Sequence, residues 1–226
     1  MTPMSVNIWS DFGKVLRELI REEKPKKIIE TGTYLGRGTT TVIASSLRDF
    51  NIGFIKFYSI EVNPNHFKSA FVHLKNSGLL GFVSLINGLS IYRHQLPDKD
   101  KIKREFLDKE WPEGVYIDHD KEFRVDRYFN ETRFDQVPDG MLLNCLEGLD
   151  YSPDLVLLDS GGHIGEVEFD SLIPVLKKPC IIALDDVFHV KHYYNLQKIK
   201  KDNRFKVLHL SKEKFGFAIV KFTPEV

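Results

Sequence analysis

The chain has 226 residues and a formal net charge of zero, with 42% hydrophobic and 28% charged residues. These values suit one domain with an ordinary core. A neutral chain gives no support to a nucleic-acid or anionic-membrane partner, so neither is expected. No apolar run is long enough to span a bilayer, and the first residues lack the pattern of a signal peptide, which predicts a cytoplasmic location. Cys145 and Cys180 lie in apolar stretches and are expected to be buried, reduced thiols.

The first part of the chain alternates predicted helices and strands. A helix is predicted after Ser10, because apolar residues then recur at helical spacing until Pro25 ends the pattern. Asn63-Pro64 is a strong helix start, since a capping residue precedes a proline at the first helical position. The elements predicted before residue 90 are strands at 27–31, 57–62 and 82–87, a helix from Thr39, and a helix from Pro64 to Gly78.

The segment 97–139 interrupts this alternation. It is rich in charge and carries scattered aromatic residues, namely Phe106, Trp111, Tyr116, Phe123 and Tyr128. It is too long for an ordinary connection and too aromatic for a disordered linker, so it is interpreted as an inserted cap over the site, with a decorative subdomain or a dimer contact as alternatives. Partial alternation over 115–125 predicts a hairpin within it, and Asp118-His119-Asp120 is interpreted as a solvated turn.

After the insertion the alternation resumes. The predicted elements are helices at 141–149, 166–176 and 193–201, strands at 154–158 and 180–184, and a final antiparallel pair at 205–210 and 215–222. Strands that alternate with helices indicate a mostly parallel sheet with helices on both faces. The expected fold class is therefore α/β, doubly wound, with residues 1–226 forming one domain that carries the insertion.

Acidic residues end most of the predicted strands. Glu30, Glu61, Asp159 and Asp185 occupy four of the five ends, and the remaining strand is followed by Gly88-Leu89-Ser90. In an open α/β sheet, ligands bind at the carboxyl ends of the strands, so these residues are the candidates for a site.

The turn after the first strand reads Glu30-Thr31-Gly32-Thr33-Tyr34-Leu35-Gly36-Arg37-Gly38-Thr39. Gly32 and Gly36 allow a tight turn and close approach of a ligand, although a turn without a ligand would look the same. Three residues separate these glycines, whereas a nicotinamide dinucleotide fingerprint requires G-x-G-x-x-G. Glu61, at the end of the next strand, can accept both hydroxyl protons of a ribose, or it is a plain surface acid.

This stretch resembles the first motif of class I S-adenosylmethionine-dependent methyltransferases. The resemblance implies a seven-stranded Rossmann-like sheet whose last strand inserts antiparallel. It also implies that Glu30 and the backbone near Gly32 hold the methionine part of S-adenosylmethionine, that Glu61 holds its ribose, and that Gly88 to Ser90 border its adenine. The predicted cofactor-binding residues are Glu30, Gly32, Tyr34, Gly36, Thr39, Glu61, Gly88 and Ser90.

The later strand ends bring together Asp159, Asp185 and Asp186. Such carboxylates repel one another unless they are protonated, spread apart or neutralised by a cation, and magnesium prefers oxygen ligands of this type. The pattern is similar to the metal-dependent small-molecule O-methyltransferases, especially those that act on sugars of macrolide and aminocoumarin antibiotics. That similarity implies a Mg²⁺ ion held by the three aspartates. The alternative is that the acids cap helices or hold the cofactor amine without a metal.

A catalytic base is harder to assign. His163 lies four residues after Asp159, in the loop expected to face the substrate, and these two are the predicted catalytic residues. His189 and His192 follow the aspartate pair and are interpreted as surface or supporting residues. Catechol-type members of the family carry a lysine a few residues after the first aspartate, whereas this chain has Ser160-Gly161-Gly162-His163, which leaves both the base and the acceptor class open.

The expected activity is methyl transfer from S-adenosylmethionine to a hydroxyl oxygen of a small-molecule acceptor. Two alternatives stay open. The first is a metal-independent methyltransferase that acts on a nitrogen or on a macromolecule. The second is a catalytically silent module that binds S-adenosylmethionine. A homodimer is compatible with the expected activity and with both alternatives.

Overall fold

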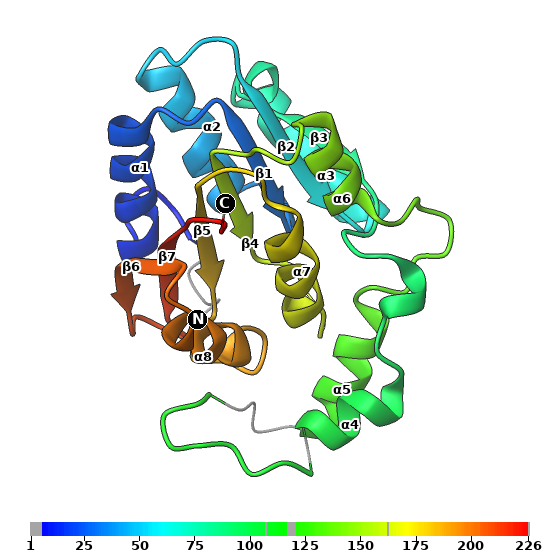
Figure 1. The fold of residues 1–226 in the computed structure, drawn as a ribbon. Helices are drawn as coiled ribbons and strands as arrows, with labels where there is room; N and C mark the ends of the chain where they lie inside the picture. The colour runs from blue at the N-terminus through cyan, green and yellow to red at the C-terminus, as the bar shows by residue number, and fades with distance from the viewer. Residues whose placement is uncertain (1–5, 107, 117–120, 162, 226) are drawn as a thin grey trace.

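A seven-stranded sheet forms the centre of the chain (Figure 1). In the computed structural model, which describes residues 6–106, 108–116, 121–161 and 163–225, the strands are β1 (Lys27–Thr31), β2 (Lys56–Glu61), β3 (Ser84–Asn87), β4 (Leu155–Leu158), β5 (Cys180–Asp185), β6 (Phe205–Ser211) and β7 (Phe217–Phe222). Their order across the sheet is β3-β2-β1-β4-β5-β7-β6. The first five strands are parallel, and β7 lies antiparallel between β5 and β6. The sheet therefore has the mostly parallel, doubly wound order that the sequence predicts.

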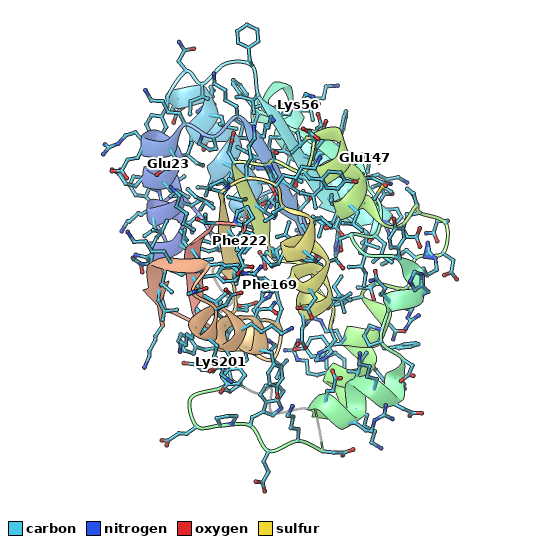
Figure 2. The ribbon with its side chains drawn as sticks, in the orientation of Figure 1. Glu23, Lys56, Glu147, Phe169, Lys201 and Phe222 are labelled. Carbon is cyan, nitrogen blue, oxygen red and sulfur yellow. The ribbon has the colours of Figure 1, made fainter. Side chains whose placement is uncertain are left out.

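Helices cover both faces of the sheet. They are α1 (Asp11–Glu23), α2 (Thr39–Asp49), α3 (Pro64–Asn76), α6 (Met141–Gly148), α7 (Gly165–Leu172) and α8 (Tyr193–Lys201), with short 3-10 turns at Leu80–Phe82, Arg93–Gln95 and Ile173–Val175. The buried faces of α1, α2 and α3 form one apolar cluster with the sheet, and those of α6, α7 and α8 form another. Figure 2 shows Phe169 and Phe222 in the interior, where both are buried, and Lys56 and Lys201 on the outside. Both cysteines are buried and free, as expected.

Local signals in the sequence explain where these helices begin. The Ser10 side chain accepts a hydrogen bond from the backbone N–H of Gly13 at 3.1 Å, and the Asn63 side chain accepts one from Asn65 at 2.9 Å. These caps satisfy backbone donors that a helix leaves free at its first turn. The predicted helix starts after Ser10 and at Pro64 are therefore confirmed.

The inserted segment contains helices, and the predicted hairpin over 115–125 is wrong. Helices α4 (Lys99–Phe106) and α5 (Lys121–Asn130) pack against each other. The reason is that Val125 and Tyr128 lie one helical turn apart and bury their side chains against Ile102. Asp118-His119-Asp120 lies outside the described residues.

The insertion lies beyond the carboxyl ends of the strands. Figure 1 shows α4 and α5 on the side to which the arrowheads of β1, β4 and β5 point. Tyr116 donates its backbone N–H to the carbonyl of Phe188 at 2.7 Å, which ties the insertion to the loop after β5. Among the described residues, no helix has the length and apolar character to cross a membrane.

Candidate active site

The turn after β1 is shaped by a glycine that no other residue can replace. Gly32 has a φ of +87°, and a Cβ built on it would lie 2.2 Å from the backbone oxygen of Asp159. Its N–H donates to the carbonyl of Ile60 at 2.9 Å. The ends of β1, β2 and β4 therefore meet at Gly32 with no room for a side chain.

A small cavity opens beside this turn. Its volume is about 30 Å³, and its lining includes the predicted cofactor residues Gly32, Glu61, Gly88 and Ser90. Thr132, from the inserted segment, also lines it. The structure thus brings residues from the ends of β1, β2 and β3 to one place. A space of this size holds no more than about two water molecules, so a larger ligand requires the lining to open.

Glu61 presents a carboxylate to this cavity. Its oxygens accept hydrogen bonds from the backbone N–H groups of Tyr34 at 2.6 Å and Asn63 at 2.8 Å. Burial raises the pKa of Glu61 to about 7, against the lowering effect of these two donors. Each carboxylate oxygen has two lone pairs, so Glu61 keeps acceptor capacity for the hydroxyl groups of a ligand.

Glu30 has a different environment from the one predicted for it. Its side chain is fully buried, and it accepts hydrogen bonds from the hydroxyl groups of Thr39 at 2.5 Å, Thr40 at 2.7 Å and Ser59 at 2.5 Å. Burial raises the pKa of Glu30 to about 7, although the three hydroxyl donors lower it. Glu30 therefore fixes the start of α2 against β1 and β2, and it exposes no surface to a ligand.

The remaining residues of the glycine-rich stretch shape the turn. Gly36 packs closely on α3, because a Cβ there would lie 3.1 Å from that of Ala70. Tyr34 has a φ of +52°, and its exposed ring meets the ring of His66 edge-on at 4.6 Å. Within the described part of the chain, Tyr34, Gly36 and Thr39 are not among the residues that line the cavity. Their predicted contacts with a cofactor remain predictions.

The three aspartates do converge, but a lysine lies among them. Carboxylate oxygens of Asp159, Asp185 and Asp186 lie within 4.8 Å of one another, as a divalent cation would require. However, the Nζ of Lys191 is 2.6 Å from Asp159 Oδ1 and 3.0 Å from Asp186 Oδ2. Because this ammonium already holds two of the three carboxylates, the cluster in this arrangement does not fit a metal ion. The Mg²⁺ ion remains a prediction, and the two contacts of Lys191 argue against it.

A second cavity, of about 230 Å³, lies between the insertion and the core. The insertion contributes Pro97, Lys101, Glu105, Lys109 and Trp111 to its lining, and the core contributes, among others, His163, Lys191 and Tyr194. Trp111 and Tyr194 lie with their rings 5.4 Å apart. The space is large enough for part of a small organic molecule and offers both aromatic surface and positive charge.

His163 lies where the insertion meets the loop after β4. Its Nε2 is 2.9 Å from Oε2 of Glu105, and this hydrogen bond lowers the pKa of Glu105. Because an ionised carboxylate can only accept, Nε2 carries a hydrogen, and in the neutral imidazole Nδ1 then has the lone pair. The predicted residue His163 thus lines the larger cavity.

The other two histidines have supporting positions. His189 makes a 3.2 Å hydrogen bond with the hydroxyl of Tyr128, which links the insertion to the loop after β5. His192 is fully buried, and burial lowers its pKa to about 3. Both histidines are buried, so neither is a surface residue, and their supporting role remains a prediction.

Two further residues of the site could not be predicted from the sequence. One is Lys191, five residues after Asp186, where the only signal is a lysine between two histidines. The other is Glu168 in the first turn of α7, which is fully buried and accepts hydrogen bonds from Ser160 at 2.6 Å and Thr31 at 3.1 Å. Glu168 joins the ends of β1 and β4, and its position in an acidic first helical turn gave no hint of burial.

Solved structures of other proteins share the fold of this chain. No protein-family model matches the sequence. The structure is similar to that of the O-methyltransferase TomG of Streptomyces achromogenes, involved in tomaymycin synthesis and solved in complex with S-adenosylmethionine, with 14% identity over 97% of this chain and 82% of that chain and a TM-score of 0.58.

Two further structures give the same result. An O-methyltransferase of Bacillus cereus, in complex with S-adenosylhomocysteine, has 13% identity over 97% of this chain and 84% of that chain, with a TM-score of 0.59. A methyltransferase of Geobacter sulfurreducens has 13% identity over 96% of this chain and 80% of that chain, with a TM-score of 0.58. At these identities the likeness is one of fold, and the fold of this chain is the Rossmann-like methyltransferase fold.

Proposed function

We propose that this chain transfers a methyl group from S-adenosylmethionine to a hydroxyl oxygen of a small molecule. The observation that carries the proposal is the meeting of Gly32, Glu61, Gly88 and Ser90 around one cavity at the carboxyl ends of β1, β2 and β3, in a methyltransferase fold. The larger cavity, with His163 and Lys191 in its lining, is the acceptor site.

The residues around Gly32 fit the cofactor. Gly32 and Glu61 line the cavity, and the lone pairs of Glu61 that its two backbone donors leave free suit the two hydroxyl groups of a ribose. When bound, S-adenosylmethionine supplies an electrophilic methyl group on a sulfonium sulfur, and its transfer leaves a neutral thioether. Thr132, from the inserted segment, is one of the lining residues, and the space of about 30 Å³ has to widen when the cofactor enters.

His163 is the base of the proposed reaction. Its Nδ1 takes the proton of the acceptor hydroxyl, and the oxygen lone pair then forms the bond to the methyl carbon. Glu105 stabilises the resulting imidazolium through its hydrogen bond to Nε2. Because Glu105 belongs to α4, the insertion supplies a part of the proton-transfer system.

The lining of the acceptor cavity favours a molecule with a negatively charged or strongly polar group, because its lysines, Lys101, Lys109 and Lys191, outnumber its acids, Glu105 and Glu166. Trp111 and Tyr194 add aromatic surface, and the Nζ of Lys109 lies over both rings, 5.6 Å and 4.3 Å from their centres.

The first test is binding of S-adenosylmethionine. Isothermal titration is expected to give saturable binding to the parent protein, and Glu61→Ala is expected to weaken it by about 10- to 100-fold, because the ribose loses a charged acceptor worth about 1.5–3 kcal/mol. Glu147→Ala, on the exposed face of α6, is the matched control and should bind as the parent does (Figure 2). Saturable binding of NAD in place of S-adenosylmethionine would contradict the proposal.

The same contact predicts a pH dependence. Burial holds the pKa of Glu61 at about 7 in the free protein, and the ribose hydroxyl groups bind the ionised form. The affinity should therefore rise as the pH rises through 7, by about tenfold between pH 6 and pH 8, because the ionised fraction rises by that factor. Glu61→Gln, titrated with the same ligand, should lose this part of the dependence. An equally steep profile in the variant would assign the effect to another group.

A further inference from the structure

Lys191 lies at the point where the acidic cluster would hold a cation. Its Nζ is 2.6 Å from Asp159 and 3.0 Å from Asp186, and its side chain is 10% exposed. Asp185 is the third member of the cluster. One lysine on the loop after β5 therefore joins the carboxyl ends of β4 and β5.

The charges of this group are complementary. Lysine is an ammonium ion near neutral pH, and the Nζ of Lys191 lies within hydrogen-bond distance of Asp159 and Asp186. The cluster therefore carries its own countercharge.

A divalent ion and this ammonium cannot share the cluster. An ion within bonding distance of the three carboxylates would lie close to the Nζ, and two cations at such a distance repel strongly in a partly buried site. An ammonium also satisfies two carboxylates by directed hydrogen bonds, which a metal would have to replace. Metal binding would therefore require Lys191 to leave.

Lys191 also reaches the acceptor cavity, since it is one of the residues that line it. An ammonium has three N–H donors, and the contacts to Asp159 and Asp186 use two of them. The third donor is available to an oxygen of the molecule in the cavity. A positive charge beside a hydroxyl oxygen stabilises the form that has lost its proton.

We propose, on the basis of the function inferred above, that the ammonium of Lys191 is the built-in cation of this site and that methyl transfer proceeds without a divalent metal. It holds Asp159 and Asp186 in place and donates a hydrogen bond to the acceptor oxygen. The proton of that oxygen passes to Nδ1 of His163, the oxygen lone pair bonds to the methyl carbon, and the electron pair of the broken carbon–sulfur bond stays on sulfur.

Manganese alone, followed by electron paramagnetic resonance, tests the proposal without an acceptor. The parent protein is expected to leave added Mn²⁺ free, whereas Lys191→Met is expected to bind one Mn²⁺ at least about tenfold more tightly, because the competing charge has gone. Lys191→Arg keeps a cation and should behave as the parent does. Lys198→Met is the matched control, because Lys198 also contacts two carboxylates, Glu166 and Asp170, but on the surface.

Two outcomes would overturn the proposal. One is a parent protein that binds Mn²⁺ and loses it in Asp185→Asn, a comparison that does not depend on the folding of Lys191→Met. The other is a folded Lys191→Met that gains no Mn²⁺ site. Neither result bears on S-adenosylmethionine binding, which calorimetry measures separately, so failure of the metal-free mechanism and failure of the proposed function are distinguishable.

Discussion

Gly32→Ala is expected to lower the free energy of unfolding by about 2–5 kcal/mol and to abolish binding of S-adenosylmethionine. A left-handed backbone costs an alanine about 1–2 kcal/mol, and overpacking adds about 1–3 kcal/mol. Both terms apply, because Gly32 has a φ of +87° and its Cβ would lie 2.2 Å from the oxygen of Asp159. Urea denaturation and isothermal titration measure the two effects.

Gly53→Ala is the control for this change. A Cβ at Gly53 meets no atom within 4 Å, so alanine there should leave both the stability and the binding close to those of the parent. If Gly32→Ala were as stable as Gly53→Ala and still bound S-adenosylmethionine, the ends of β1 and β4 would not be as close as the structure has them.

Glu30→Ala is expected to be the second strongly destabilising change, with a loss of about 3–5 kcal/mol. The substitution leaves the hydroxyl groups of Thr39, Thr40 and Ser59 without their buried acceptor, and each unmet donor costs about 1–3 kcal/mol. Thermal and urea denaturation should show the loss. Glu23→Ala, at the exposed end of α1, should change stability little (Figure 2).

Glu30→Gln separates the charge of this residue from its hydrogen bonds. Burial raises the pKa of Glu30 from 4.5 to about 7, so the folded state binds a proton that the unfolded state has lost between these values. The parent should therefore lose stability as the pH rises from 4.5 towards 7, and the glutamine variant should lose less over that window. Identical pH profiles would mean that the pKa of Glu30 is the same in the folded and the unfolded protein.

Much of the fold could be predicted because its strands are short, apolar and separated by clear helix signals. The strand Lys27–Thr31 and the helix Tyr193–Lys201 have the predicted bounds, and β7 pairs antiparallel as expected. The structure of the insertion was harder to predict. Residues 115–125 partly alternate, as in a strand, whereas Val125 and Tyr128 have the spacing of a helix. The helix is stabilised by packing against Ile102 of α4 and Val190 of the loop after β5, and such partners cannot be inferred from a local pattern.

The site was predicted as a set of positions but not as a set of contacts. Strand-end acids are easy to find, yet Glu30 points to the hydroxyl groups of α2, whereas Glu61 faces the cavity. Lys191 was missed because its place depends on a reversal of the chain: Asp186 has a φ of +59°, and His189 donates its N–H to the carbonyl of Asp186 at 3.0 Å. That turn brings Lys191 back to Asp159, which no spacing rule would show.

The place of β7 in the sheet has a consequence for biosynthesis. The strand Phe217–Phe222 follows every other strand in sequence, yet it lies between β5 and β6. While the chain is being made, β5 is an open edge and β6 has no partner in the sheet, until residue 222 has left the ribosome. Unpaired strand edges can pair with other chains and aggregate. The nascent protein is therefore expected to depend most on chaperones before β7 has formed.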